Sequence, residues 1–219
     1  VSGRIQGLGR QAPVIRADLG ESGGPSSLYE KALAALGQLD ILVLNASVQF
    51  RRDWSEYDRK EVDELLAVNV RSSYELMTLA LPAMRAAGWG RVLTIGSVQQ
   101  VRPSPMFAPY AASKLAQLGL VRTLAPQVAA DGVTLNNLAP GTIETDRNTR
   151  ALADPGYREK VRMQIPAGRF GTPEDCVGAA LLLCSEAGAY ITGTDFFVDG
   201  GMVLSARLET TANQQAGYE

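Results

Sequence analysis

The stretch GSVQQVRPSPMFAPYAASK, residues 96–114, links a predicted strand to a predicted helix. The apolar run before it, RVLTI at residues 91–95, ends at Gly96. Tyr110 and Lys114 follow in the first turns of the helix. Residues four apart share one face of a helix, so we expect the Lys114 ammonium to lie close to the Tyr110 phenol.

These side chains form a candidate site for acid–base chemistry. A neighbouring cation favours the phenolate, which predicts that Lys114 lowers the pKa of Tyr110 from about 10 toward neutrality. Ser97 lies at the carboxyl end of the preceding strand and could offer its hydroxyl to the same substrate oxygen. The set suits reduction of a carbonyl or oxidation of an alcohol. A Tyr-x-x-x-Lys pair also occurs by chance on solvated helix surfaces, so the assignment depends on the surrounding segments.

Short apolar runs and amphipathic segments alternate along the chain. The run at residues 39–44 has no polar alternation after Asp40, which is typical of a strand buried on both faces of a parallel sheet. The pattern predicts an α/β fold, a doubly wound parallel sheet with helices on both faces. The expected strands are residues 14–18, 39–44, 92–95, 133–138 and 195–198, and the expected helices are residues 28–36, 55–87, 110–130 and 173–185.

We expect residues 1–203 to form a single domain and residues 204–219 to form a polar tail that either frays or lies across a neighbouring subunit. Between residues 143 and 168 the periodicity fades into polar and charged residues. This segment is predicted to be irregular, either a lid over a substrate or a surface insertion.

The composition limits the classes of partner. The net charge of −2 and the absence of a long basic run or an apolar run of membrane-spanning length argue against nucleic acid and membrane partners. The two cysteines, Cys176 and Cys184, are about 12 Å apart on one predicted helix, too far for a mutual disulfide. They suggest thiols in a reducing compartment, the cytoplasm. The chain has no histidine, which excludes His-based triads and His-ligated metals, and we expect no metal.

Several further segments carry a resemblance to a known family. Residues 44–47, LNAS, are similar to an Asn-Asn-Ala-Gly motif, and Asn69 matches a helix asparagine that accompanies Ser97, Tyr110 and Lys114 in a catalytic tetrad. In this order and spacing, the segments resemble the short-chain dehydrogenase/reductases, and most of all their 3-oxoacyl-acyl-carrier-protein reductase and sugar-alcohol dehydrogenase group. The other matching segments are residues 140–145, 168–174 and 191–201.

The resemblance implies a Rossmann-type fold and an NAD(P)-dependent oxidoreductase that interconverts a ketone and a secondary alcohol by hydride transfer. Tyr110 would be the general acid/base, and Ser97 would orient and polarise the substrate oxygen. Lys114 would hold the nicotinamide ribose and lower the pKa of the tyrosine. Asn69 would hold a water that relays protons to solvent.

The resemblance also implies the partners. The cofactor would be NADP or NAD, with NADP preferred, and the substrate a small carbonyl compound or alcohol, with Gln99 and Gln100 suggesting a hydroxylated one. The implied assembly is a homotetramer that packs the helices of Asn69 and Tyr110 against a neighbour. The implied cofactor-binding residues are Asp18 and Leu19 at the adenine, Asn45, Ala46 and Ser47 after a strand, Tyr110 and Lys114, and Pro140, Gly141, Ile143 and Thr145 beside the nicotinamide and phosphates.

Two departures from the family pattern stand out. Ser47 replaces a glycine where the backbone would approach the cofactor closely. The phosphate-binding Gly-x-x-x-Gly-x-Gly pattern matches residues 3–9, yet only four residues separate Gly9 from Val14, too few for the helix, strand and helix that should intervene. We interpret residues 1–9 as the end of a helix with an accidental match. The alternative is that residues are missing between Gly9 and Val14.

On either interpretation the first two strands of the fold are absent from these residues. The next strand would then lack a partner, and the following one would have an open apolar edge. We expect the natural protein to be longer by about sixty residues, with a normal glycine-rich loop.

Three functions remain open from the sequence. The first is a 3-oxoacyl-acyl-carrier-protein reductase, and the second is a sugar or polyol dehydrogenase of the same family. The third is a regulatory protein that senses the nucleotide without turning it over, although such a sensor has no physical need for the complete set of Asn69, Ser97, Tyr110 and Lys114.

Overall fold

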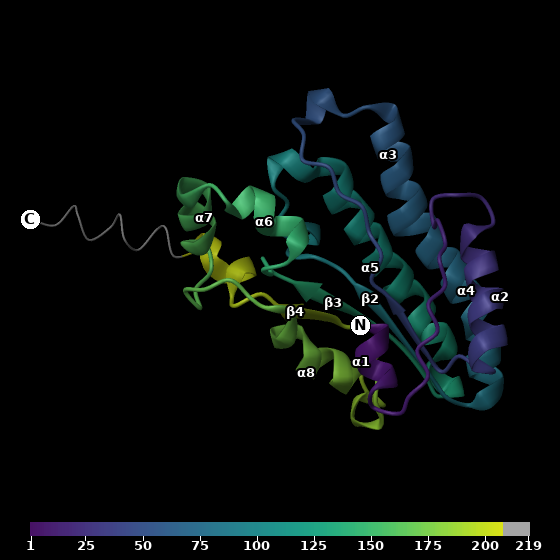
Figure 1. Cartoon of the computed structure of the whole chain (residues 1–219). Coiled ribbons are helices and arrows are strands. Elements are labelled where there is room, and N and C mark those ends of the chain that lie inside the picture. Colours follow the sequence, from purple (N-terminus) through teal and green to yellow (C-terminus); the bar gives the residue numbers. More distant parts are fainter. Residues whose placement is uncertain (208–219) are drawn as a thin grey trace, which may run out of the picture.

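The computed structural model describes residues 1–207, and four strands form one parallel sheet in that part of the chain. The strands lie in the order β1-β2-β3-β4, and each neighbouring pair is parallel. The predicted doubly wound α/β arrangement is confirmed (Figure 1). The strand bounds are Ile41–Leu44 for β1, Gly90–Ile95 for β2, Val133–Pro140 for β3 and Asp195–Val198 for β4.

Helices cover both faces of this sheet (Figure 1). Successive residues of a strand point to opposite faces. Val92 accordingly packs with residues of α4 and α5, whereas Leu93 packs with Leu183 of α8. The core therefore has two layers, one on each side of the strands. The helix bounds are Ser2–Gln6 for α1, Gly24–Leu36 for α2, Ser72–Ala87 for α4, Ala108–Val128 for α5 and Pro173–Leu183 for α8.

The long helical region predicted at residues 55–87 begins at Arg59 because Asp58 caps it. The Asp58 carboxylate accepts a hydrogen bond from the Lys60 amide at 2.8 Å. Helix α3 (Arg59–Leu65) continues through a π-helical turn (Leu66–Arg71) into α4. Turns of this kind are rare and often lie at functional sites. This one contains Asn69, whose side chain is completely buried.

The segment at residues 143–168 is more regular than its sequence predicts. It contains α6 (Asp146–Leu152) and α7 (Pro155–Arg162), so the expectation of an irregular excursion is wrong. Each helix is short and buries few residues, which hides its periodicity. Leu152 and Ile165 nevertheless pack with Phe170 in a small separate core.

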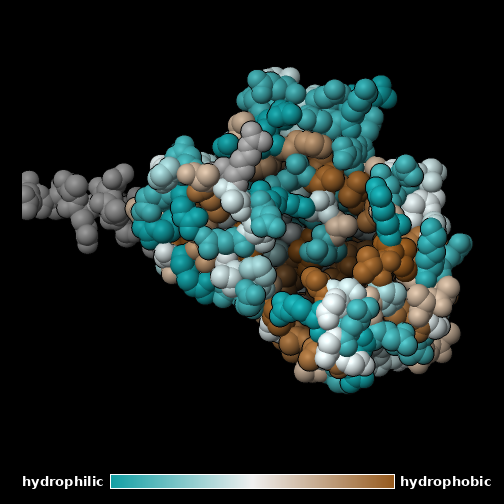
Figure 2. All heavy atoms as spheres, viewed as in Figure 1, coloured by the Kyte–Doolittle hydropathy of each residue, from teal (hydrophilic) through white to brown (hydrophobic). Residues whose placement is uncertain are grey.

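The predicted strand at residues 14–18 is also wrong, because this segment has no regular structure. A strand needs a neighbour for its backbone hydrogen bonds. Within residues 1–207 no strand pairs with the outer edge of β1, where Ile41 and Val43 are 42% and 49% exposed. The predicted open apolar edge is therefore present. Figure 2 shows one face of the molecule, which is hollowed in its middle, and hydrophobic surface lines the hollow.

Two expectations concern the ends of the described region, a helix end at residues 1–9 and a tail from residue 204, and the structure agrees with each in part. Residues 2–6 form the short helix α1, so Gly3 lies inside a helix rather than in a loop between a strand and a helix. Met202–Arg207 form a 3₁₀ helix, and the rest of the predicted tail, residues 208–219, lies outside the described residues. No helix within residues 1–207 is long and apolar enough to cross a membrane.

Gly132 joins α5 to β3 at a position that only glycine tolerates. Its φ is +75°, and a Cβ there would collide with the backbone carbonyl oxygen of Gly88. We expect Gly132→Ala to lower the free energy of unfolding by about 2–4 kcal/mol, measured by urea denaturation. Gly178→Ala, in α8 with open space around it, is the control and should be neutral or stabilising by up to about 1 kcal/mol. An equal response of the two variants would contradict the argument.

Candidate active site

Ser97 lies just beyond the carboxyl end of β2, where the chain turns into a short 3₁₀ helix, Val98–Gln100. Its hydroxyl oxygen accepts a hydrogen bond from the Gln99 amide at 3.2 Å, and its own amide donates to Gln100 Oε1 at 3.3 Å. This reciprocal capping fixes both the backbone and the side chain of Ser97 at the strand end.

A buried polar network anchors the turn to the neighbouring strands β3 and β4. Gln100 Nε2 donates to both carboxylate oxygens of Asp195, at 2.8 and 2.7 Å. Asn137 Nδ2 donates to the same carboxylate at 2.7 Å, and Thr94 Oγ1 donates to Asn137 Oδ1 at 2.6 Å. Gln100 therefore supports Ser97 from within the core, and the suggestion that it contacts a hydroxylated substrate is wrong. Gln99 instead accepts from the Ser104 amide at 2.7 Å.

Tyr110 and Lys114 lie on the inward face of α5, as their spacing predicts. Tyr110 is 6% exposed and Lys114 1% exposed. The Lys114 ammonium donates to the Ile95 carbonyl oxygen and to Gln117 Oε1, both at 2.8 Å, and lies 5.7 Å from the centre of the Tyr110 ring. The Ile95 contact ties the lysine to the same strand end that carries Ser97.

Burial controls the protonation of both groups. It lowers the pKa of Lys114 to about 7, and the positive charge of Arg147 acts in the same direction. Burial also raises the pKa of Tyr110, while hydrogen bonding to the Ser97 side chain and the charge of Arg147 oppose that rise. The expectation that Lys114 brings the pKa of Tyr110 toward neutrality is therefore wrong for the protein alone, because desolvation outweighs the Ser97 hydrogen bond and the charge of Arg147.

Asn69 is held on three sides from its π-helical turn. Its side-chain amide donates to the Val48 carbonyl oxygen and to Ser113 Oγ, both at 3.0 Å, and its Oδ1 accepts from the Val48 amide at 2.9 Å. All three hydrogen bonds of the Asn69 side chain are made within the protein. The main-chain carbonyl oxygen of Asn69 points along the helix toward Ser73.

A chain of polar contacts joins Asn69 to Lys114. Gln117 accepts from the Lys114 ammonium, and its Nε2 donates to Ser73 Oγ at 2.8 Å. The Ser73 hydroxyl in turn donates to the Asn69 carbonyl oxygen at 2.9 Å. Sequence reasoning missed both Gln117 and Ser73. The available signal was polar character on the inward face of α5, three residues after Lys114, since buried polar side chains require partners.

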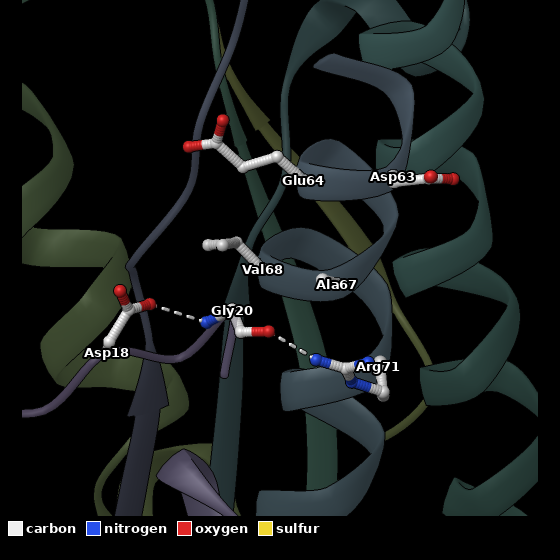
Figure 3. A pocket seen from close by; sticks show the side chains of 7 residues that line it. All are labelled: Asp18, Gly20, Asp63, Glu64, Ala67, Val68 and Arg71. Atoms are coloured by element: carbon white, nitrogen blue, oxygen red, sulfur yellow. Dashed lines mark hydrogen bonds between the residues drawn. The ribbon is translucent and has the colours of Figure 1, made fainter. Parts of the chain in front are cut away.

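The residues implied in cofactor binding lie around the carboxyl ends of the strands. Asp18 and Gly20 line an open hollow with Val68 and Arg71 (Figure 3). The Gly20 amide donates to Asp18 Oδ1 at 2.8 Å, and Arg71 Nη2 donates to the Gly20 carbonyl oxygen at 2.5 Å. Leu19 packs partly against the main core. The hollow thus joins the segment before α2 to the π-helical turn.

The remaining implied residues follow β1 and β3. Asn45 and Ala46 are exposed at the end of β1, and Thr145 is exposed at the start of α6. Pro140 ends β3, and the Gly141 amide donates to the Val198 carbonyl oxygen at 3.0 Å. Ile143 forms an isolated parallel bridge with Gly171. Parallel strands present their carboxyl ends at one edge, so these segments border the same side of the sheet as Ser97.

Ser47 makes a contact that the sequence did not predict. Arg147 of α6 donates from Nη1 to Ser47 Oγ at 2.9 Å and from Nη2 to the Ser47 carbonyl oxygen at 2.7 Å. The departure from glycine at residue 47 therefore has a structural partner, and the pair connects the segment after β1 to α6.

A family model described as enoyl-(acyl carrier protein) reductase matches residues 3–203. The chain belongs to the short-chain dehydrogenase/reductase family. It is 36% identical over 197 residues to the 3-oxoacyl-[acyl-carrier-protein] reductase of Escherichia coli (strain K12), covering 90% of this chain and 80% of that protein. It is 33% identical over 199 residues to the 2-dehydro-3-deoxy-D-gluconate 5-dehydrogenase of Dickeya dadantii (strain 3937), covering 90% and 79%.

Solved structures of short-chain dehydrogenase/reductases agree with this assignment. A 3-oxoacyl (acyl-carrier-protein) reductase from Agrobacterium tumefaciens C58, crystallised with NADP bound, superposes with a TM-score of 0.87 at 43% identity, covering 91% of this chain and 78% of that one. The fold is accordingly of the Rossmann type, and the protein is an NAD(P)-dependent oxidoreductase.

Within this short-chain dehydrogenase/reductase, Gln117 offers a test of how Lys114 is held. We expect Gln117→Leu to lower kcat about tenfold and to lower the pKa of Lys114 further, because the ammonium loses one of its two acceptors. A pH–rate profile should show the shift. Gln127→Leu removes an exposed glutamine from the same helix and should leave the profile unchanged. A pH profile unaltered in both variants would count against a positioning role for Gln117.

Proposed function

We propose that the protein interconverts a ketone and a secondary alcohol with NADP as cofactor and Tyr110 as general acid/base. The observation that carries the proposal is the convergence of Ser97, Tyr110 and Lys114 at one strand end, with both ionisable side chains buried. Burial raises the pKa of Tyr110, so the phenol is protonated at neutral pH, as the donor of a proton to a carbonyl oxygen must be.

The other roles follow from the hydrogen bonds. An ammonium has three N–H donors. Ile95 and Gln117 take two of those of Lys114, and the third is available for a ribose hydroxyl of the cofactor. Ser97, fixed by its capping bonds, would orient the substrate oxygen against Tyr110. The Asn69 carbonyl oxygen, joined to Lys114 through Ser73 and Gln117, would hold the water that returns protons to the site.

The described residues fit a nicotinamide dinucleotide at this edge of the sheet. The hollow that Asp18 and Val68 line offers a carboxylate and an apolar side chain, which suits an adenine, and the third donor of Lys114 suits the nicotinamide ribose. The cofactor supplies a hydride at the nicotinamide ring. Leu19, Asn45, Ala46, Pro140, Gly141, Ile143 and Thr145 would border it. The Agrobacterium tumefaciens relative was crystallised with NADP, which supports NADP over NAD.

Two substrate classes are compatible with these relatives. The Escherichia coli relative is named for 3-oxoacyl groups on acyl carrier protein. The Dickeya dadantii relative is named for a keto sugar acid. Arg147 favours the second class, because a guanidinium near Tyr110 and Lys114 suits a small anionic substrate.

We also propose that the protein is a cytoplasmic homotetramer. Its two cysteines are free thiols, as a reducing compartment favours. α4 and α5 expose Tyr74 and Leu115, which are 50% and 52% exposed, and these faces would meet the same helices of a neighbour. Light scattering coupled to size exclusion measures the mass of the particle, and a monomer at micromolar concentration would contradict the tetramer.

The experiment that tests the proposed function is a calorimetric titration with NADPH and, separately, NADH. We expect micromolar binding of NADPH and weaker binding of NADH. The complex should then oxidise NADPH when a ketone is added, followed at 340 nm as the absorbance of the reduced nicotinamide. Binding of neither nucleotide would contradict the proposed activity, and tighter binding of NADH would contradict the preference for NADP.

A further inference from the structure

Arg147, like the half-buried Arg102, donates its side-chain hydrogen bonds only to neutral oxygens, whereas several other arginines of the described chain pair with acids. Arg52, Arg85 and Arg158 each meet a carboxylate. Arg147 instead donates to neutral oxygens of a single residue, Ser47 Oγ and the Ser47 carbonyl oxygen. Within residues 1–207 no carboxylate oxygen lies within 4 Å of its guanidinium nitrogens. Its charge is therefore held in place without being neutralised.

The two hydrogen bonds fix where this charge lies. Ser47 follows β1, and Arg147 belongs to α6, so the contact spans the carboxyl edge of the sheet that carries Ser97. Two of the five N–H groups of the guanidinium are used on Ser47, which leaves a fork of donors for another acceptor. Asp146, the neighbour of Arg147 in α6, lines a different hollow with Thr149 and Arg158.

The charge of Arg147 acts on the proposed reaction site directly. It opposes the rise that burial causes in the pKa of Tyr110 and adds to the fall that burial causes in the pKa of Lys114, so both side chains lie within electrostatic range of the guanidinium. No acidic group contributes to either shift. The charged guanidinium thus acts on the buried Lys114 and Tyr110 with no acidic group to offset it, an arrangement that an incoming anion would stabilise.

We propose that Arg147, oriented by Ser47, binds an oxyanion of a reactant in the Tyr110 site, either a carboxylate of the substrate or a phosphate of the cofactor. The proposal rests on the proposed function, because it assigns the ligand of the same site. Ser47 acts as a positioning residue: its side chain and backbone hold the guanidinium plane so that the remaining N–H donors are presented together.

The test measures binding without turnover, in the complex of the protein with NADP⁺ and a ketone. The two ketones are 5-keto-D-gluconate, which carries a carboxylate, and L-sorbose, which has the same carbon skeleton with a neutral end. Dissociation constants are measured by calorimetry for the unaltered protein, for Arg147→Met and for Arg59→Met. Arg59 is an exposed arginine of α3 and controls for the change in net charge.

Either of two results supports the proposal and identifies the source of the oxyanion. If the oxyanion is the substrate carboxylate, Arg147→Met weakens 5-keto-D-gluconate at least tenfold and leaves L-sorbose and NADP⁺ unchanged. If it is a cofactor phosphate, the same variant weakens NADP⁺ at least tenfold. Unchanged dissociation constants for all three ligands, or equal changes in Arg59→Met, would overturn the proposal.

Two variants of Ser47 test the same proposal without altering Arg147, so the result does not depend on whether Arg147→Met folds. Ser47→Gly removes the side-chain anchor and should weaken the affected ligand about threefold, while Ser47→Thr retains the hydroxyl and should restore binding. The two proposals are tested by different measurements. Loss of turnover with intact binding in Tyr110→Phe tests the role of Tyr110 in catalysis. A change of dissociation constant in Arg147→Met tests the binding of the oxyanion.

Discussion

Tyr110→Phe is expected to lower the rate of NADPH oxidation by a ketone by about 10³-fold or more while leaving NADPH affinity within about twofold. The substitution removes only the phenol oxygen, which would donate the proton to the substrate. The ring, which lies against Phe107 and below Lys114, keeps its packing. Turnover is measured by the decrease in NADPH absorbance, and affinity by the fluorescence of the bound nucleotide.

Tyr190→Phe is the matched control, because that tyrosine is fully exposed. It should retain full activity. Unchanged turnover in Tyr110→Phe would remove Tyr110 from the mechanism, even if the nucleotide still bound. An unaltered protein that binds the nucleotide but turns over no ketone or alcohol, with Tyr110→Phe indistinguishable from it, would instead favour the nucleotide-sensing alternative.

Lys114→Met is expected to reduce turnover about 100-fold and to change how stability depends on pH. The pKa of Lys114 is lowered to about 7 from its ordinary 10.5. Between these two values the unfolded chain binds a proton that the folded chain has released. The free energy of unfolding of the native protein should therefore rise with pH across this window, by a few kcal/mol in total. Below pH 7 both states hold the proton, and this contribution to the slope vanishes.

The methionine variant has no such group, so its stability should lack this rise. Urea denaturation at pH 6, 8 and 10 measures the difference between the two proteins. Lys31→Met, at an exposed position of α2, should follow the native protein. A native protein whose stability is flat from pH 7 to 10, relative to Lys114→Met, would show that Lys114 is not desolvated as the structure indicates.

Much of the architecture was accessible from local patterns. The strand ending at Ile95 and the helix carrying Tyr110 are both bounded by glycine or proline, and their apolar periods differ, so their type and position were predicted correctly. Helices α6 and α7 escaped prediction because few of their residues are buried, and those that pack inward contact residues outside both helices, such as Phe170 and Met202. The strand predicted at residues 14–18 was wrong for a different reason. The sequence is strand-like, but a strand forms only where a neighbouring strand accepts and donates its backbone hydrogen bonds.

The candidate site shows the same division. Ser97, Tyr110 and Lys114 were predicted to lie together, since helix spacing and a strand end are sequence properties. The environment of these side chains could not be predicted from the sequence. The raised pKa of Tyr110 depends on how much water is excluded, and the support of Ser97 depends on Asp195 and Asn137, which only tertiary packing brings together. The partner of Ser47 likewise lies a hundred residues away along the chain.

The network beneath Ser97 has a consequence for the order in which the protein matures during synthesis. A nascent chain that has emerged as far as Phe170 already contains Asn69, Ser97, Tyr110 and Lys114, but not the carboxylate of Asp195. Until that residue leaves the ribosome and β4 joins the sheet, Gln100 has a buried amide without its acceptor, and the turn around Ser97 lacks its anchor. The turn that holds Ser97 therefore gains its anchor only after Asp195 has been made, long after Tyr110 and Lys114.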